Sequence, residues 1–181
     1  MIYVFLADGF EEIEALTPVD LLRRAGKEVV TVGVGGRSIT GAHGITVNAD
    51  ICDSDISEIP AGLEMAVLPG GMPGAANIAE SAAVDRVIEF AAANSRIIAA
   101  ICAAPAVVLG RYAFTHGRRM TCYPGFEELL ERSVVTGNGV EEDGDLITAK
   151  GPGMAMNFAL ALVSRLSGAS AAENLKGSLQ C

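Results

Sequence analysis

The chain lacks the features that mark membrane, nucleic-acid-binding and metal-binding proteins. No apolar run reaches the roughly 18 residues that a membrane-spanning helix needs. No basic cluster is longer than Arg118-Arg119, in a chain whose formal net charge is −9, which argues against electrostatic binding of nucleic acid. The four cysteines, at positions 52, 102, 122 and 181, form no CxxC pair and no metal-ligand spacing. We therefore expect no membrane or nucleic-acid partner and no bound metal.

Phosphate-binding and export signals are missing as well. The sequence contains neither GxxxxGK(S/T) nor GxGxxG, so it has no nucleotide-phosphate loop. No basic region precedes the apolar residues 1–6, which read as a first strand rather than as a signal peptide. These absences predict a cytoplasmic protein whose thiols are free.

Half of the 181 residues are hydrophobic, enough for the core of one domain over residues 1–181. Short apolar segments alternate with helical patterns, which predicts an α/β sandwich with a mostly parallel central sheet. The predicted strands are 2–7, 28–33, 65–68, 96–101, 119–123, 134–140 and 146–149, and the predicted helices are 10–24, 82–93, 126–132, 154–166 and 169–179, with a small hairpin over 37–48. Pro18 predicts a kink or a restart within the first helix.

Cys102 lies where a predicted strand meets a predicted helix. Proline is tolerated in the first turn of a helix, so Pro105 predicts a helix that begins at about Cys102. Alanines on both sides of the cysteine suit a sharp strand-to-helix elbow. The free N–H groups and positive end of that helix would lower the pKa of the thiol. The alternative is a buried structural cysteine at the end of a core strand.

Three turns, at 8–14, 69–74 and 102–105, each follow a predicted strand and should converge on one edge of the sheet. Backbone N–H groups of Gly70, Gly71 and Ala103 would there form an oxyanion hole for an attacked carbonyl. The alternative for the two glycines is a tight turn at a strand exit.

Glu14 is a candidate partner for Cys102. It stands between Ile13 and Ala15 in the first helix, so it can point inward, and a buried carboxyl tends to keep its proton. A protonated Glu14 would donate a hydrogen bond to the Cys102 thiolate, and the pair would titrate as a coupled unit. The alternative is that Glu11, Glu12 and Glu14 form a solvated acidic face of the helix.

Four motifs resemble the ThiJ/PfpI superfamily, in its DJ-one/ThiJ branch of parkinsonism-associated, deglycase-like proteins. They are Asp8-Gly9-Phe10-Glu11-Glu12-Ile13-Glu14, Leu68-Pro69-Gly70-Gly71, Ala99-Ala100-Ile101-Cys102-Ala103-Ala104-Pro105 and Lys150-Gly151-Pro152-Gly153. The resemblance implies one class I glutamine amidotransferase-like domain with a flavodoxin-like three-layer sandwich, helices on both faces and a homodimer. It also implies a nucleophilic, oxidation-prone Cys102 with Glu14 hydrogen-bonded to it, and a site lined by the backbone of Gly70, Gly71 and Ala103.

The chain departs from the family pattern at two accessory positions. Tyr123 stands where some members have a histidine before the proline that matches Pro124, and His43 stands where some have an arginine that reaches the site of the partner subunit. Both are possible accessory residues. Protease-like relatives have a histidine directly after the cysteine, whereas this chain has Ala103, which argues against peptidase activity.

The leading hypothesis is a cofactor-independent hydrolase or lyase of glyoxalase or protein deglycase type. It would act on methylglyoxal-type dicarbonyls or their glycated adducts and protect against oxidative stress. The alternative is a redox sensor or chaperone in which Cys102 is oxidised to a sulfinate without significant turnover. A third hypothesis is a structural dimer module whose elbow has no chemical role.

Overall fold

The computed structural model describes residues 1–181, and its centre is a seven-stranded sheet in the order β10-β11-β7-β6-β1-β2-β5. The strands are β1 (Ile2–Leu6), β2 (Val29–Gly33), β5 (Ile51–Cys52), β6 (Met65–Leu68), β7 (Ile97–Ile101), β10 (Val140–Asp143) and β11 (Leu146–Ala149). Every neighbouring pair is parallel except β10 and β11. The predicted mostly parallel sheet is confirmed.

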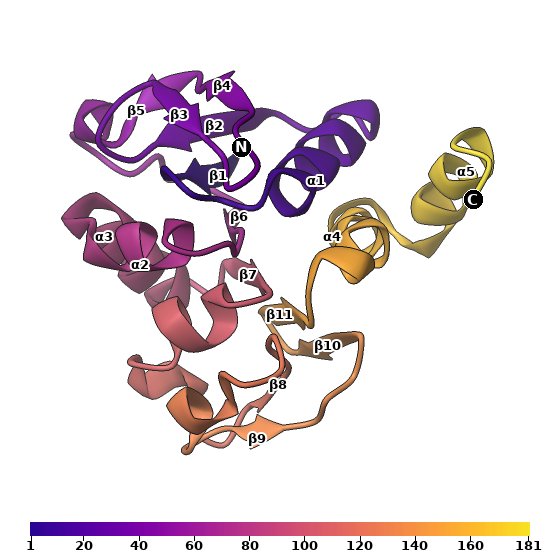
Figure 1. Cartoon of the computed structure of the whole chain (residues 1–181). Helices are drawn as coiled ribbons and strands as arrows, with labels where there is room; N and C mark the ends of the chain where they lie inside the picture. Colours follow the sequence, from indigo (N-terminus) through magenta and orange to yellow (C-terminus); the bar gives the residue numbers. More distant parts are fainter.

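Helices cover both faces of the sheet, as predicted (Figure 1). On one face α1 (Glu12–Arg24) packs against α4 (Ala155–Ser167), and on the other α2 (Gly74–Glu80) and α3 (Ala82–Ala93) pack against the central strands. All residues of β1 and β6 are buried, which explains why these strands are continuous apolar runs rather than alternating ones. The last helix, α5 (Ala169–Ser178), lies outside these layers and packs on α4.

The predicted restart at Pro18 is wrong, because α1 runs without a break from Glu12 to Arg24. Pro18 has no N–H to donate to the Glu14 carbonyl, yet it is itself buried in the helix interface. The packing of α1 against α4 and the sheet outweighs the local cost of the proline.

Several connecting segments also differ from the prediction. The segment after Cys102 forms a five-residue π-helix, η2 (Pro105–Leu109), rather than an α-helix that begins at the cysteine. The predicted helix at 126–132 is only a 3-10 turn, η4 (Glu127–Leu130). The predicted strands at 119–123 and 134–140 contribute β8 (Arg119–Met120) and β9 (Val134–Val135), which pair with each other outside the main sheet.

The small hairpin is confirmed as β3 (Ser38–Thr40) and β4 (Thr46–Asn48), which pair antiparallel. The remaining short elements are the 3-10 turns η1 (Asp53–Asp55), η3 (Ala113–Thr115) and η5 (Pro152–Met154). None of the helices has the length and apolar character needed to cross a bilayer.

Candidate active site

The turns that follow β1, β6 and β7 meet at one edge of the sheet, as predicted. These strands are parallel neighbours, so their carboxyl ends point the same way. The Glu11 N–H donates to the Gly70 carbonyl at 3.0 Å, and the Gly74 N–H donates to the Gly9 carbonyl at 3.3 Å. The chain leaves β1 towards β2 and later returns on the other side to β6, and ligands bind at such reversals of strand order.

Cys102 stands at the elbow between β7 and η2 in a strained backbone conformation. Its φ is +66°, in the left-handed region that side chains disfavour by roughly 1–2 kcal/mol. Two backbone hydrogen bonds of 2.8 Å hold it there: its N–H donates to Ala149, and its carbonyl accepts from the Tyr123 N–H. The side chain is almost enclosed, since the residue is only 9% exposed. Non-glycine strain of this kind is often found at functional sites.

Glu14 is fully buried and lies beside Cys102. Its Oε2 accepts a hydrogen bond of 2.9 Å from the Gly70 N–H, while its Oε1 is buried without a hydrogen-bond partner. A Cβ added at Gly70 would lie 2.6 Å from the Cys102 Cβ and 2.7 Å from Glu14 Oε2. Gly70 therefore stands between the two side chains, and the absence of a Cβ lets them approach each other. The predicted pairing of Cys102 and Glu14 agrees with this geometry.

The electrostatics of the pair follow from burial. Burial raises the pKa of Glu14 to about 7, opposed by hydrogen bonds with Cys102 and with the Gly70 amide. Burial, followed by the charge and hydrogen bond of Glu14, raises the pKa of Cys102 to about 12. The predicted lowering of the thiol pKa by a helix terminus is therefore wrong, because burial and Glu14 outweigh it. Between these two values the pair holds one proton and one negative charge, with the proton on the Cys102 sulfur and the charge on the Glu14 carboxylate in the resting state.

The three predicted oxyanion donors separate into two groups. The N–H groups of Gly71 and Ala103 face the Cys102 sulfur, and their hydrogen bonds favour its thiolate form. The Gly70 N–H is instead engaged by Glu14. Gly70 is therefore a positioning residue for the carboxyl rather than a donor to a substrate, because the inward rotamer of Glu14 occupies its amide.

Replacing Gly70 with alanine is expected to destabilise the fold by about 1–3 kcal/mol, because the new methyl group overlaps Cys102, Glu14 and the Ile101 carbonyl oxygen, which would be 2.9 Å away. Urea-induced unfolding gives this free energy. Gly62→Ala is the matched control, since a Cβ at Gly62 meets no atom within 4 Å. Equal unfolding free energies for the two variants would contradict the close approach around Gly70.

Tyr123 is fixed beside the elbow through its backbone, and its exposed ring lines a surface pocket of about 510 Å³. The ring meets Phe126 edge to face, with 6.5 Å between centroids. The pocket also includes Lys150, Gly151 and Met154. Lys150 belongs to the motif Lys150-Gly151-Pro152-Gly153 but is not among the predicted site residues. Its position directly after β11, at the carboxyl edge of the sheet, is the signal that could have identified it.

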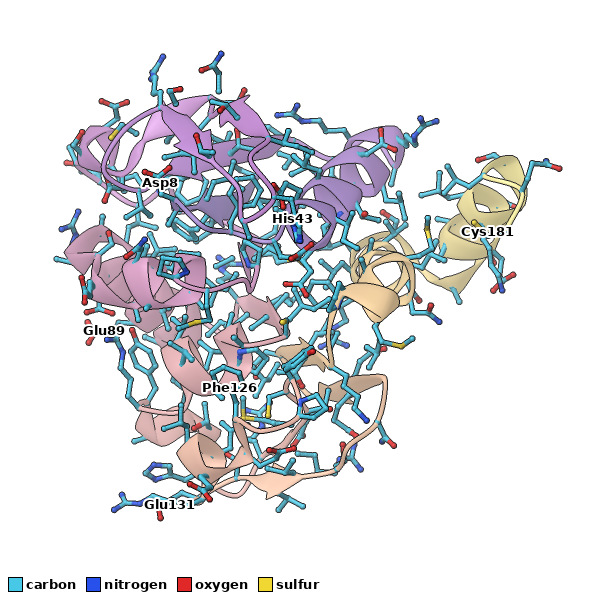
Figure 2. All side chains as sticks on the ribbon, in the orientation of Figure 1. Asp8, His43, Glu89, Phe126, Glu131 and Cys181 are labelled. Carbon is cyan, nitrogen blue, oxygen red and sulfur yellow. The ribbon has the colours of Figure 1, made fainter.

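His43 does not lie against Cys102. It is at the tip of the β3–β4 hairpin, beside the start of α1 (Figure 2), where its N–H donates to Glu12 Oε1 at 2.8 Å and its Nδ1 lies 2.9 Å from Glu12 Oε2. Glu11 Oε1 lies 3.6 Å from the same ring nitrogen. Each of these three side chains offers a ligand atom within 4.8 Å of the others. Because both Glu12 oxygens are engaged by His43, the cluster fits an anchor for the hairpin better than a metal site.

The His43 pKa is expected to lie above its usual value of 6.5, because the ring is hydrogen-bonded to Glu12 and close to the charge of Glu11. A titration followed by NMR of the imidazole protons measures it. Glu12→Gln should return the pKa towards 6.5, and Glu11→Gln, which removes only a neighbouring charge, should lower it less. The anchor would be refuted if neither variant moved the titration.

Comparisons with known proteins agree with this architecture. A family model described as the DJ-1/PfpI family matches residues 1–165. "Protein DJ-1 homolog B" of Arabidopsis thaliana is 34% identical over 176 residues, which make up 96% of this chain and 40% of that protein. "Parkinson disease protein 7 homolog" of Danio rerio is 34% identical over 180 residues, 97% of this chain and 94% of that protein. The chain thus spans less than half of the plant relative and nearly all of the fish relative.

A third relative, "Glutathione-independent glyoxalase DJR-1.2" of Caenorhabditis elegans, is 31% identical over 169 residues, 87% of this chain and 83% of that protein. Among solved structures, a DJ-1 superfamily protein from Salmonella typhimurium has a TM-score of 0.93 at 34% identity and covers 99% of this chain and 97% of its own. The structure described as oxidized DJ-1 of Toxoplasma gondii has a TM-score of 0.93 at 33% identity, with the same coverage. These structures share the flavodoxin-like α/β fold.

Proposed function

Because the chain belongs to the DJ-1/PfpI family, we propose that it is a cofactor-independent enzyme that converts methylglyoxal-type α-oxoaldehydes to 2-hydroxy acids. Cys102 is the nucleophile and Glu14 carries the proton. The observation that supports this proposal is the enclosed pair itself, a thiol and a carboxyl at the carboxyl edge of the sheet with one proton between them near neutral pH. The glyoxalase named among the relatives is consistent with it.

The first step uses both members of the pair. The Cys102 proton passes to the Glu14 carboxylate, the electron pair of the resulting thiolate forms a bond to the aldehyde carbon, and the C=O π electrons move to oxygen, which takes that proton from Glu14. The product is a hemithioacetal, and Glu14 is left as a carboxylate. The Gly71 and Ala103 amides face the sulfur, and the oxygen that becomes negative is on the carbon bonded to that sulfur, so these amides also stabilise this step.

The carboxylate then moves hydrogen between neighbouring carbons. Glu14 removes the proton of the former aldehyde carbon to give an enediolate, and returns it to the former ketone carbon. The hydroxyl on the sulfur-bearing carbon passes its proton to the former ketone oxygen, which leaves a 2-hydroxy thioester. Water hydrolyses the thioester and releases the thiolate. The aldehyde carbon is oxidised to an acid, the ketone carbon is reduced to an alcohol, and one water is consumed, so no external oxidant or reductant is needed.

The same chemistry extends to glycated adducts. Methylglyoxal bound to a protein thiol is itself a hemithioacetal, and its release presents the same carbon to Cys102. We propose deglycase activity on such adducts, and protection under oxidative stress, as consequences of this reactivity in the cytoplasm.

The test is lactate formation from methylglyoxal without glutathione or added metal, followed by NMR. We expect lactate well in excess of one equivalent per protein molecule, because a thiol that only traps the aldehyde as a hemithioacetal would form none. Cys181→Ser is the control and should be fully active, since Cys181 is exposed at the outer end of the chain (Figure 2). No lactate above the protein-free rate would refute the proposal.

Redox sensing is a second candidate, favoured by the amides of Gly71 and Ala103 at the Cys102 sulfur, which would also stabilise a sulfinate. Oxidation by peroxide requires two equivalents of the oxidant to reach this state. Peptide mass spectrometry after mild peroxide treatment should find the sulfinate concentrated on Cys102. Equal oxidation of all four cysteines would rule this function out.

We further propose a homodimer that covers the first helix and the hairpin. Ile13 and Ile45 are 51% and 54% exposed, and they line one largely apolar groove with Leu16 and Met156. Sedimentation velocity should show a dimer that Ile13→Lys dissociates. Leu129→Lys is the control, because Leu129 is 53% exposed on a different part of the surface. A monomeric wild-type protein would contradict the proposal.

A further inference from the structure

The pocket beside the elbow contains a cation without a partner. Lys150 lines it and is half-buried, yet its ammonium group makes no hydrogen bond or ion pair. This is unusual in a chain with 22 acidic and 13 basic side chains, where charge balance favours pairing of every base. Apart from Arg132, all other lysines and arginines contact a carboxylate or a carbonyl, as follows: Arg23, Arg24, Lys27, Arg37, Arg86, Arg96, Arg111, Arg118, Arg119, Arg165 and Lys176.

The pocket provides no acid of its own. Its lining consists of Lys150, Tyr123, prolines, glycines and Met154. The cavity that Arg132 lines differs in this respect, because Glu128 and Glu131 share it. An ammonium group in a concave, acid-free surface is suited to bind an anion from a ligand.

The pocket adjoins the reactive centre through the backbone. Ala149, which accepts the Cys102 N–H at 2.8 Å, directly precedes Lys150, and Tyr123, whose N–H donates to the Cys102 carbonyl at 2.8 Å, forms another part of the wall. The Lys150 N–H is held by the Gly139 carbonyl at 2.9 Å. The base of the lysine is therefore fixed relative to the elbow, while its ammonium group remains free.

We infer that Lys150 selects substrates whose reactive carbonyl is joined to a carboxylate, so that the carbonyl meets Cys102 and the carboxylate lies in the pocket on the ammonium group. This inference rests on the proposed function and narrows its substrate class to α-oxoaldehydes with an anionic tail. A carboxylate fits better than a phosphate, since the pocket offers one cation and no phosphate loop. Tyr123 and Met154 would pack against the carbon chain of the tail.

A matched pair of substrates tests the inference. 4,5-Dioxopentanoate is an α-oxoaldehyde with a terminal carboxylate, and 2-oxopentanal has a methyl group in place of that carboxylate. We expect Lys150→Met to raise KM for dioxopentanoate by about tenfold, the value of one charge-assisted contact, with kcat and all constants for 2-oxopentanal within about twofold of wild type. Lys150→Arg should largely restore KM.

Arg132→Met is the matched control, because it removes the other unpartnered cation at the same cost in net charge. Arg132→Met should change neither KM nor kcat for either substrate. If Lys150→Met raised KM equally for both substrates, or for neither, the inference would be overturned.

A binding experiment keeps this inference separate from the proposed activity. 4-Oxopentanoate has the same tail but no aldehyde, so it binds without turnover, and 2-pentanone is its neutral counterpart. In NMR titrations of the wild-type protein, 4-oxopentanoate alone should shift the amide signals of Lys150, Gly151 and Gly139, and Lys150→Met should abolish the shifts. Shifts without any oxoaldehyde turnover would refute the enzyme but retain the anion pocket. Oxoaldehyde turnover without these shifts would refute the anion pocket but retain the enzyme.

Discussion

Cys102→Ser is expected to reduce kcat/KM for methylglyoxal by on the order of 10³-fold or more, because a serine hydroxyl in this site has no base strong enough to ionise it. The carboxyl of Glu14 reaches a pKa of only about 7, far below that of an alcohol. The Cys102 thiol differs because its pKa of about 12 still makes it a stronger acid than an alcohol, so moving its proton to Glu14 costs less. The rate of lactate formation at saturating and limiting methylglyoxal gives both constants.

Cys122→Ser is the matched control for that variant. Cys122 is also buried, and burial raises the pKa of its thiol to about 11, but it has no carboxyl partner comparable to Glu14. The control should keep activity within about twofold, a change typical of a residue outside the reacting atoms. Retention of more than about a tenth of wild-type activity by Cys102→Ser would contradict the assignment of the nucleophile.

Glu14→Gln is expected to lower kcat by about 10²- to 10⁴-fold, the usual contribution of a positioned acid or base. Glutamine keeps the shape of the side chain, accepts the Gly70 N–H and can donate to sulfur. It cannot transfer a proton between the two carbons of the substrate. We therefore expect the loss in kcat rather than in KM. Glu11→Gln, which removes a charge near the pair without touching it directly, should leave kcat within a few-fold of wild type.

Glu14→Gln should also change how the free energy of unfolding depends on pH. Since the Glu14 pKa is raised from 4.5 to about 7 on folding, the folded protein binds its proton more tightly than the unfolded chain does. This stabilises the fold below pH 4.5 and is lost as pH rises through 7, a change of about 3 kcal/mol for the shift from 4.5 to about 7. Urea unfolding at pH 4.5 and 8 should show this fall in wild type and a smaller one in Glu14→Gln. Equal pH dependence in both proteins would place the titrating group elsewhere.

The sheet and the meeting of the three turns could be predicted from sequence because they depend on patterns along the chain. Apolar runs such as 2–7 and 65–68 define buried strands, and parallel strands necessarily bring their carboxyl ends together. No sequence pattern predicts the short helix α2 (Gly74–Glu80), since it begins at a glycine and is too short to show a helical period. The continuity of α1 through Pro18 depends on tertiary packing that no local pattern reports.

The chemistry of the site is harder to predict from sequence for the same reason. Which group receives the Gly70 N–H is decided by the inward rotamer of Glu14, and a rotamer in the core is set by its neighbours. The predicted direction of the thiol pKa shift is wrong, because the effect of a helix end can be estimated from sequence whereas the depth of burial cannot. Lys150 stands out only once the partners of the other basic side chains are known, because it and Arg132 alone have none and only the pocket of Lys150 is free of acids.

The left-handed backbone at Cys102 also matters for protein engineering. Glycine adopts a φ of +66° without the penalty that a side chain incurs, so directed evolution for thermostability alone has a route to a more robust fold through Cys102→Gly. That variant would have no nucleophile. Heat-challenge selections on this scaffold would therefore enrich inactive clones at this position, and need to be coupled to a catalytic readout.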